Sequence, residues 1–195
     1  VWKKEDVVLA AQESGALLAT PLNDPRTPDG CGSFKLNIAG SGLLVVNLLG
    51  RTFMKETGLT CPFRAMDDFL KSQEDFSGPI ILDFHAEATS EKVALGWYLD
   101  GRISALLGTH THIPTADYKI LPQGTAYVTD LGMVGPADSV LGVTKELIIE
   151  KFLTDGPIIF NYPETGPAEV NAVLLEFDAS NKAIKIEKIN QLAQS

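Results

Sequence analysis

At 195 residues, with 45% hydrophobic and 21% charged residues, the chain suits a single globular domain over residues 1–195 with a buried core. A net charge of −9 with scattered lysines and arginines argues against duplex nucleic acid as a partner, and no apolar run approaches the roughly 20 residues that span a bilayer. Two cysteines, Cys31 and Cys61, are too few for a disulfide framework, which favours a cytoplasmic location.

The first third of the chain predicts helix, hairpin and helix. Helical spacing over 3–14 ends at Gly15, and the Pro-, Asp- and Gly-rich stretch that follows predicts a loop. "SFKLNI" and "LLVVNLL" flank "AGSG" and predict a β-hairpin whose second strand is buried. Pro62 then suits the first turn of a helix over 62–72, because proline is favoured at that position.

The middle of the chain predicts a β-α-β unit. "PIILDFH" is a short, continuously apolar strand of the buried, parallel kind, and "ISALLG" is a second one. The segment "TSEKVALGWYLDG" between them predicts a helix with Thr89 or Ser90 as its cap and Gly101 after its end. Both strands therefore run in the same direction within one sheet.

The last third predicts a small hairpin, a loop, a helix and a long hairpin. "YKIL" and "AYVTD" flank the turn "PQG", and 130–142 is a glycine-rich loop. Residues 144–156 predict a capped amphipathic helix, and 168–178 with 183–189 alternate as an antiparallel hairpin. The whole pattern predicts an α/β protein with mixed sheets and helices outside them.

The three histidines of the chain fall at one edge of this predicted sheet. His85 ends the first strand of the β-α-β unit, and His110 and His112 follow the second strand in the string "GTHTH". Carboxyl ends of parallel strands meet at the edge where open α/β sheets bind ligands, and residues i and i+2 of an extended chain face the same way. Imidazole suits Zn, Mn, Fe or Ni, so the pattern predicts a metal site, with hydrogen-bonded structural histidines as the alternative.

Several polar residues near the histidines are candidates for orienting a ligand or contacting a substrate. Acidic side chains in loops are otherwise solvated caps or turn formers, and threonines are otherwise β-formers. The candidates for these supporting roles are Asp83, Glu87, Thr109, Thr111, Asp117 and Asp130.

The strings around the histidines resemble a known family. The stretch from "LDFHAEATSEK" through "GTHTHIPTAD" to "DLGMVGPADSVLGV", together with "NLLGRTFM" and "CPFRAMDDFL", is similar to the YmdB-type metallophosphoesterases of the calcineurin-like superfamily, a cyclic-nucleotide phosphodiesterase family. The resemblance implies a four-layer α/β/β/α sandwich of two mixed sheets. It also implies two divalent metals, Fe or Mn before Zn, with His85 and His110 on one ion and His112 on the other.

The resemblance further implies ligands that these 195 residues do not contain. The family has an aspartate, a Glu-Asn pair and a "GNH" element whose histidine is the proposed general acid, and "VWKKED" matches the position just after that element. We therefore expect the general-acid histidine upstream of Val1. On this reading the chain lacks its N-terminal strands, carries no catalytic residue of its own and is inactive alone.

The intact protein is then expected to hydrolyse a small phosphodiester, a 2',3'-cyclic or 3',5'-cyclic nucleotide, and to form a homo-oligomer. Two alternatives stay open: a phosphomonoesterase of the same superfamily, and a non-catalytic truncated domain whose histidines are structural.

Overall fold

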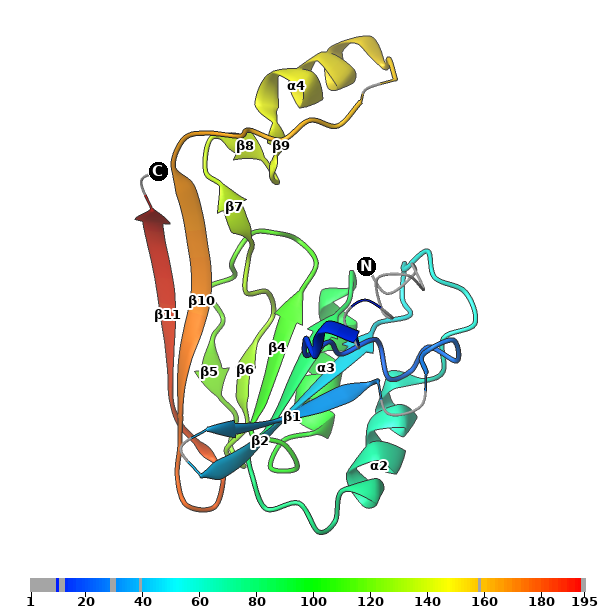
Figure 1. Ribbon diagram of the computed structural model, residues 1–195, viewed down its shortest axis with the longest axis vertical. Helices are drawn as coiled ribbons and strands as arrows, with labels where there is room; N and C mark the ends of the chain where they lie inside the picture. Colours follow the sequence, from blue (N-terminus) through cyan, green and yellow to red (C-terminus); the bar gives the residue numbers. More distant parts are fainter. Residues whose placement is uncertain (1–9, 11–12, 29–30, 39, 158, 194–195) are drawn as a thin grey trace.

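The computed structural model describes residues 10, 13–28, 31–38, 40–157 and 159–193, and most of its elements are arranged around one six-stranded sheet (Figure 1). The strand order is β1-β2-β3-β4-β6-β5, in which β2 (Ser41–Leu49), β3 (Ile80–His85), β4 (Ala105–Thr109) and β6 (Ala126–Val128) run parallel. The antiparallel strands β1 (Ser33–Ile38) and β5 (Lys119–Ile120) form its two edges. The predicted hairpins and the parallel β-α-β unit are thereby confirmed, whereas the helix predicted over 3–14 falls mostly outside the described residues.

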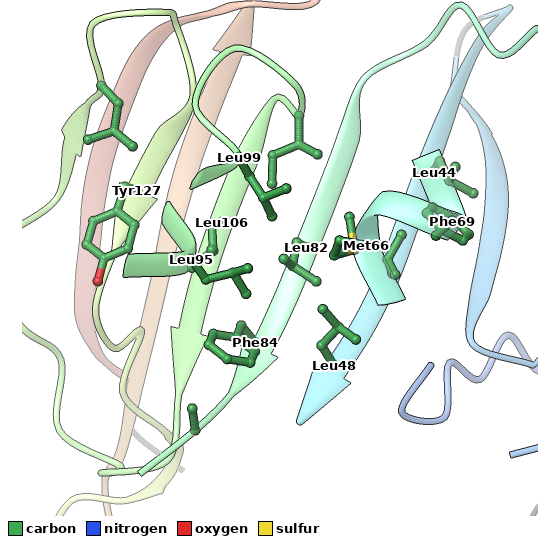
Figure 2. Close-up of a cluster of buried hydrophobic side chains, with 14 residues drawn as sticks. Leu44, Leu48, Met66, Phe69, Leu82, Phe84, Leu95, Leu99, Leu106 and Tyr127 are labelled. Atoms are coloured by element: carbon green, nitrogen blue, oxygen red, sulfur yellow. The ribbon is translucent and has the colours of Figure 1, made fainter. Parts of the chain in front are cut away.

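Helices α2 (Pro62–Ser72) and α3 (Thr89–Tyr98) cover one face of this sheet. The largest core cluster lies between these helices and the sheet, because alternate residues of each strand point at the helices. Figure 2 shows Met66 and Phe69 of α2, Leu95 of α3 and Leu99, which directly follows α3, facing the strands. The strand residues of this cluster include Leu44, Val46, Leu48, Leu82, Phe84, Leu106 and Tyr127.

The opposite face of the large sheet packs against a second, smaller sheet. Its order is β11-β10-β7, made of β7 (Val134–Pro136), β10 (Ala168–Phe177) and β11 (Ala183–Ala193). Small side chains at Ala105, Ala126 and Ala183 let the two sheets approach closely. This face of the large sheet also carries Asn47, Asp83 and His85, since they alternate with the helix-facing residues.

The α/β class and the packing of two sheets are confirmed, with differences in detail. The small sheet is antiparallel rather than mixed. Within the described part of the chain, no helix covers its outer face, because α4 (Lys145–Thr154) lies apart, beside the two-stranded ribbon of β8 (Ser139–Val140) and β9 (Val143–Thr144) (Figure 1). The described residues thus supply three of the four expected layers.

Three local predictions are wrong. The loop predicted over 130–142 contains β7 and β8, which are too short to produce a periodic pattern. Helix α3 begins at Thr89 with Ala88 as its N-cap residue, so neither predicted side-chain cap forms. Helix α4 has no side-chain cap either, because the Thr144 hydroxyl donates to the carbonyl of Asn161, and none of its residues is buried.

Candidate metal centre

His85 and His110 are brought together at the carboxyl edge of the large sheet. His85 is the last residue of β3, and its register partner Thr109 is the last residue of β4, so His110 leaves the sheet directly beside it. His85 Nε2 and His110 Nδ1 lie 3.3 Å apart, and the two rings meet edge to face with centroids 5.0 Å apart. The topology of the β-α-β unit therefore produces the predicted juxtaposition.

This spacing fits two ligands of one metal ion. Imidazole nitrogens bind Zn²⁺ at about 2.0–2.1 Å, which places two nitrogens on a tetrahedral ion roughly 3.4 Å apart. Among the described residues, no three His, Cys, Asp or Glu side chains lie together as a group that could hold a metal ion. The described edge thus offers a histidine pair, and a metal ion held there would need further ligands.

The catalytic histidine expected upstream of Val1 has no counterpart in this sequence, whose three histidines are His85, His110 and His112. Val1 itself lies outside the described residues. The assignment of the general acid to a residue before Val1 therefore stays a prediction.

A polar chain behind His85 fixes which of its nitrogens is available. Thr109 Oγ1 lies 3.1 Å from His85 Nδ1 and 3.3 Å from Asp83 Oδ1, and Asn47 Nδ2 donates to Asp83 Oδ2 at 2.7 Å. Because Thr109 donates its single hydroxyl proton to the carboxylate, it accepts the Nδ1 proton of His85. The lone pair of His85 Nε2 then points toward His110, as a metal ligand requires.

Burial sets the charge state of these groups. Burial lowers the pKa of His85, and the neighbouring His110 lowers that pKa further, so His85 is neutral at neutral pH and available as a ligand. Burial raises the pKa of the Asp83 carboxyl, and the hydrogen bonds from Asn47 and Thr109 oppose that rise only in part.

His112 lies in the same loop but faces another element. Its Nδ1 is 3.2 Å from the carbonyl oxygen of Leu141, between β8 and β9, so Nδ1 carries the proton and Nε2 keeps its lone pair. His110 and His112 have φ values of 147° and 67°, a region that residues other than glycine rarely adopt. Such strain is held only where the surroundings impose it, and it concentrates at functional sites.

The glycine of "GTHTH" is required by the neighbouring strand. A Cβ at Gly108 would collide with the backbone carbonyl of Thr129, which follows β6. Gly108 O also accepts a hydrogen bond from Leu131 N, so β4 and the segment after β6 are in direct backbone contact where the histidines begin.

The other predicted residues take different places around this edge. Glu87 Oε2 lies 4.0 Å from His110 Nε2 and is half exposed. The Thr111 hydroxyl donates to Ile113 O. Asp117 accepts hydrogen bonds from Thr115 and Thr129, which engages its carboxylate with the loop and the end of β6.

Asp130 is the predicted candidate most directly tied to the histidine loop. Its Oδ2 accepts the backbone N–H of Thr111 at 2.8 Å, and Lys92 Nζ lies 3.3 Å from the same oxygen. Sequence reasoning missed Lys92, because a lysine in the first turn of a helix normally lies in solvent. It also missed Asn47, although a polar residue inside an otherwise apolar strand is a signal that the sequence shows.

A loop beside His85 borders a cavity of about 380 Å³. Gly50 N donates to His85 O, and the Glu91 carboxylate accepts the backbone N–H groups of Arg51 and Thr52. These bonds fix the loop next to the histidine pair. The cavity is lined by Arg51, Thr52, Cys61, Pro62, Phe63 and Glu91.

Solved structures share this fold. A protein of Thermus thermophilus described as hypothetical is 40% identical, with a TM-score of 0.86 over 98% of this chain and 73% of that one. A novel phosphatase from Mycoplasma pneumoniae is 35% identical, with a TM-score of 0.78 over 90% of this chain and 63% of that one. The chain therefore has the mixed α/β fold of a class of structures that includes a phosphatase.

Sequence comparison gives the family. The model of the YmdB-like protein family matches residues 1–189, and the chain belongs to that family. A relative from Bacillus subtilis strain 168, a 2',3'-cyclic-nucleotide 2'-phosphodiesterase, is 47% identical over 173 residues, which cover 88% of this chain. The aligned region spans 64% of that relative's length.

Proposed function

We propose that the intact protein is a metal-dependent phosphodiesterase that hydrolyses cyclic nucleotides, with 2',3'-cyclic nucleotides as the first substrates to test. One observation carries the proposal: His85 Nε2 and His110 Nδ1 lie 3.3 Å apart at the carboxyl edge of a parallel sheet, with the other nitrogen of His85 already bonded to Thr109. The name of the Bacillus subtilis relative supplies the substrate class.

The proposed centre holds two divalent ions, Fe or Mn in preference to Zn. His85 and His110 would hold one ion and His112 the other, together with the carboxylate and amide ligands that the family resemblance implies. Such ions polarise the phosphoryl group and make water a stronger nucleophile near neutral pH. The chain itself contributes neutral imidazoles whose orientation is fixed by Thr109 and by the carbonyl of Leu141.

The test uses the full-length gene product loaded with Mn²⁺ or Fe²⁺. We expect hydrolysis of 2',3'-cyclic nucleotides that chelation abolishes and that His85→Ala and His110→Ala reduce to background, with a matching loss of bound metal. Tyr98→Phe is the control, because it removes the hydroxyl that donates to Asp67 on the helix side of the sheet and leaves the histidine pair untouched. Full activity in His85→Ala, or in the metal-free protein, contradicts the proposal.

A phosphomonoesterase is the second candidate, favoured by the likeness to the Mycoplasma pneumoniae phosphatase. The two activities are separated by comparing kcat/KM for 2',3'-cyclic and 3',5'-cyclic nucleotides with that for a nucleoside monophosphate. A full-length protein that binds no metal and hydrolyses none of them favours a non-catalytic domain instead.

We also propose a cytoplasmic homo-oligomer. The two cysteines of the sequence, Cys31 and Cys61, are too few for a disulfide framework, which suits a reducing compartment. In the part of the chain that the structure describes, no helix has the length and apolarity to cross a membrane.

Phe152 and Leu153 of α4 are about four-fifths exposed, and a second copy would cover them. Light scattering of the full-length protein tests the oligomeric state. We expect an oligomer that Phe152→Ser weakens, and a monomeric wild-type protein contradicts the proposal.

A further inference from the structure

A buried ion pair lies under the histidine loop and has no part in the function proposed above. Lys92 Nζ and Asp130 Oδ2 are 3.3 Å apart, and each side chain is only 1% exposed. A charge taken out of water at this depth is strongly destabilising unless it is paired and hydrogen-bonded. Apolar residues of similar volume are often at least as stabilising as such a pair, so stability alone gives little reason for it.

The hydrogen bonds of Asp130 show what the pair holds. Oδ2 accepts the N–H of Thr111 at 2.8 Å, the residue between His110 and His112. Oδ1 accepts the N–H of Gly132 at 2.9 Å, so one carboxylate joins the histidine loop to the segment after β6. The backbone N–H and C=O of Asp130 also both bond Thr115 of the same loop.

The backbone on both sides of Thr111 needs such an anchor. His110 and His112 have positive φ values, and residues other than glycine hold such conformations only where the surrounding structure imposes them. A fixed acceptor for the amide between them selects that conformation. The ammonium of Lys92, which lies on the buried side of α3, contacts the acceptor carboxylate and holds it in place.

We propose that Lys92 and Asp130 are positioning residues that hold the backbone between His110 and His112 in the conformation in which both imidazoles bind metal. This inference rests on the proposed metal site. The two residues touch neither the metal nor the substrate, and they act through the peptide of Thr111. Ligand supports of this kind typically change metal affinity by 10- to 100-fold when removed.

The experiment compares variants of the full-length protein by two measurements. The main variant is the double substitution Lys92→Met/Asp130→Leu, which removes the acceptor and leaves no unpaired buried charge. Asp130→Asn is the second, since an amide offers one acceptor oxygen in place of two. Leu99→Ala is the control, because it opens a cavity in the core under the same helix and leaves the loop bonds intact.

The first measurement is amide hydrogen exchange at Thr111 in the metal-free protein, and the second is the Kd for Mn²⁺ from calorimetric titration. We expect Thr111 to exchange at least about 10-fold faster and the Kd to rise about 10- to 100-fold in the double variant, with smaller changes in Asp130→Asn. Leu99→Ala should lower Tm while leaving Thr111 protected and the Kd unchanged.

Two results overturn the inference alone: unchanged exchange at Thr111 in both variants, or an equal rise of the Kd in a Leu99→Ala protein of matched Tm. Wild-type protein that binds no Mn²⁺ overturns the proposed function instead. The exchange measurement then still decides whether Asp130 anchors the loop, because it needs no metal.

Discussion

The hydroxyl of Thr109 connects a buried carboxylate to a histidine whose free nitrogen faces a second histidine. Thr109 can play this part because β3 and β4 pair in parallel, which places Thr109 opposite His85 and its hydroxyl within reach of Asp83. A threonine at this point therefore does more than favour the strand. It fixes the proton on His85 Nδ1 and leaves Nε2 as the nitrogen that meets His110.

Thr109→Val is expected to weaken metal binding by the full-length protein about 10- to 100-fold, because it removes the acceptor for His85 Nδ1 at nearly constant volume. It should also lower the free energy of unfolding by about 1–3 kcal/mol, since buried Asp83 loses a hydrogen bond. Mn²⁺ titration and urea unfolding measure the two effects. Thr109→Ser, which keeps the hydroxyl, is the control, and equal affinity in the valine and serine variants contradicts the role.

At the scale of elements, a feature can be predicted from the sequence when neighbouring residues cause it, and cannot when its cause lies far along the chain. The strands of the β-α-β unit are continuous apolar runs between glycines and prolines, and their parallel pairing brings His85 and His110 to one edge. Strands of two or three residues, such as β7 and β8, have no period to detect. Burial of Lys92 depends on Asp130, 38 residues further along the chain, so no local pattern indicates it.

Gly108→Ala is expected to destabilise the junction of β4 and the segment after β6. An added Cβ meets the backbone carbonyl of Thr129, which cannot yield as a flexible side chain would, and overpacking of this kind costs about 1–3 kcal/mol. Thermal unfolding should show a lower Tm, and metal affinity should fall with it because His110 follows two residues later. In the control Gly135→Ala, the added Cβ makes only ordinary contact with Met133, so its Tm should stay close to the wild-type value.

Asp117 links the loop after the histidines to the end of β6 and gives stability a dependence on pH. Burial opposes its charge, but hydrogen bonds from Thr115 and Thr129 outweigh burial and lower its pKa. A carboxyl with a lowered folded-state pKa stabilises the fold above its unfolded pKa of about 3.9, and this stabilisation is lost as pH falls through the folded value. Asp117→Asn should therefore cost about 1 kcal/mol at pH 7 and less at pH 3.

Urea unfolding of wild type and Asp117→Asn at both pH values measures this effect. A difference in unfolding free energy that is the same at pH 7 and pH 3 would show that the charge of Asp117 contributes nothing.

At the scale of the whole molecule, the candidate site lies on the rim of a sheet rather than in the core. Helices α2 and α3 bury one face of that sheet, and the hairpin β10–β11 with β7 closes part of the other (Figure 1). The described residues bring a histidine pair to the rim, and no group of three or more His, Cys, Asp or Glu side chains among them could hold a metal ion.

This small set of ligands predicts how a polypeptide of these 195 residues behaves. Neutral imidazoles offset none of the charge of a divalent ion, and two of them give fewer ligands than a catalytic site usually has, so we expect weak binding of a single metal ion. We expect no turnover of 2',3'-cyclic nucleotides, whereas the full-length protein hydrolyses them under the same conditions. Calorimetric titration with Mn²⁺ and a hydrolysis assay on both polypeptides measure this. His85→Ala in the 195-residue polypeptide should abolish the weak binding, and metal-dependent hydrolysis by the unmodified 195-residue polypeptide would contradict this expectation.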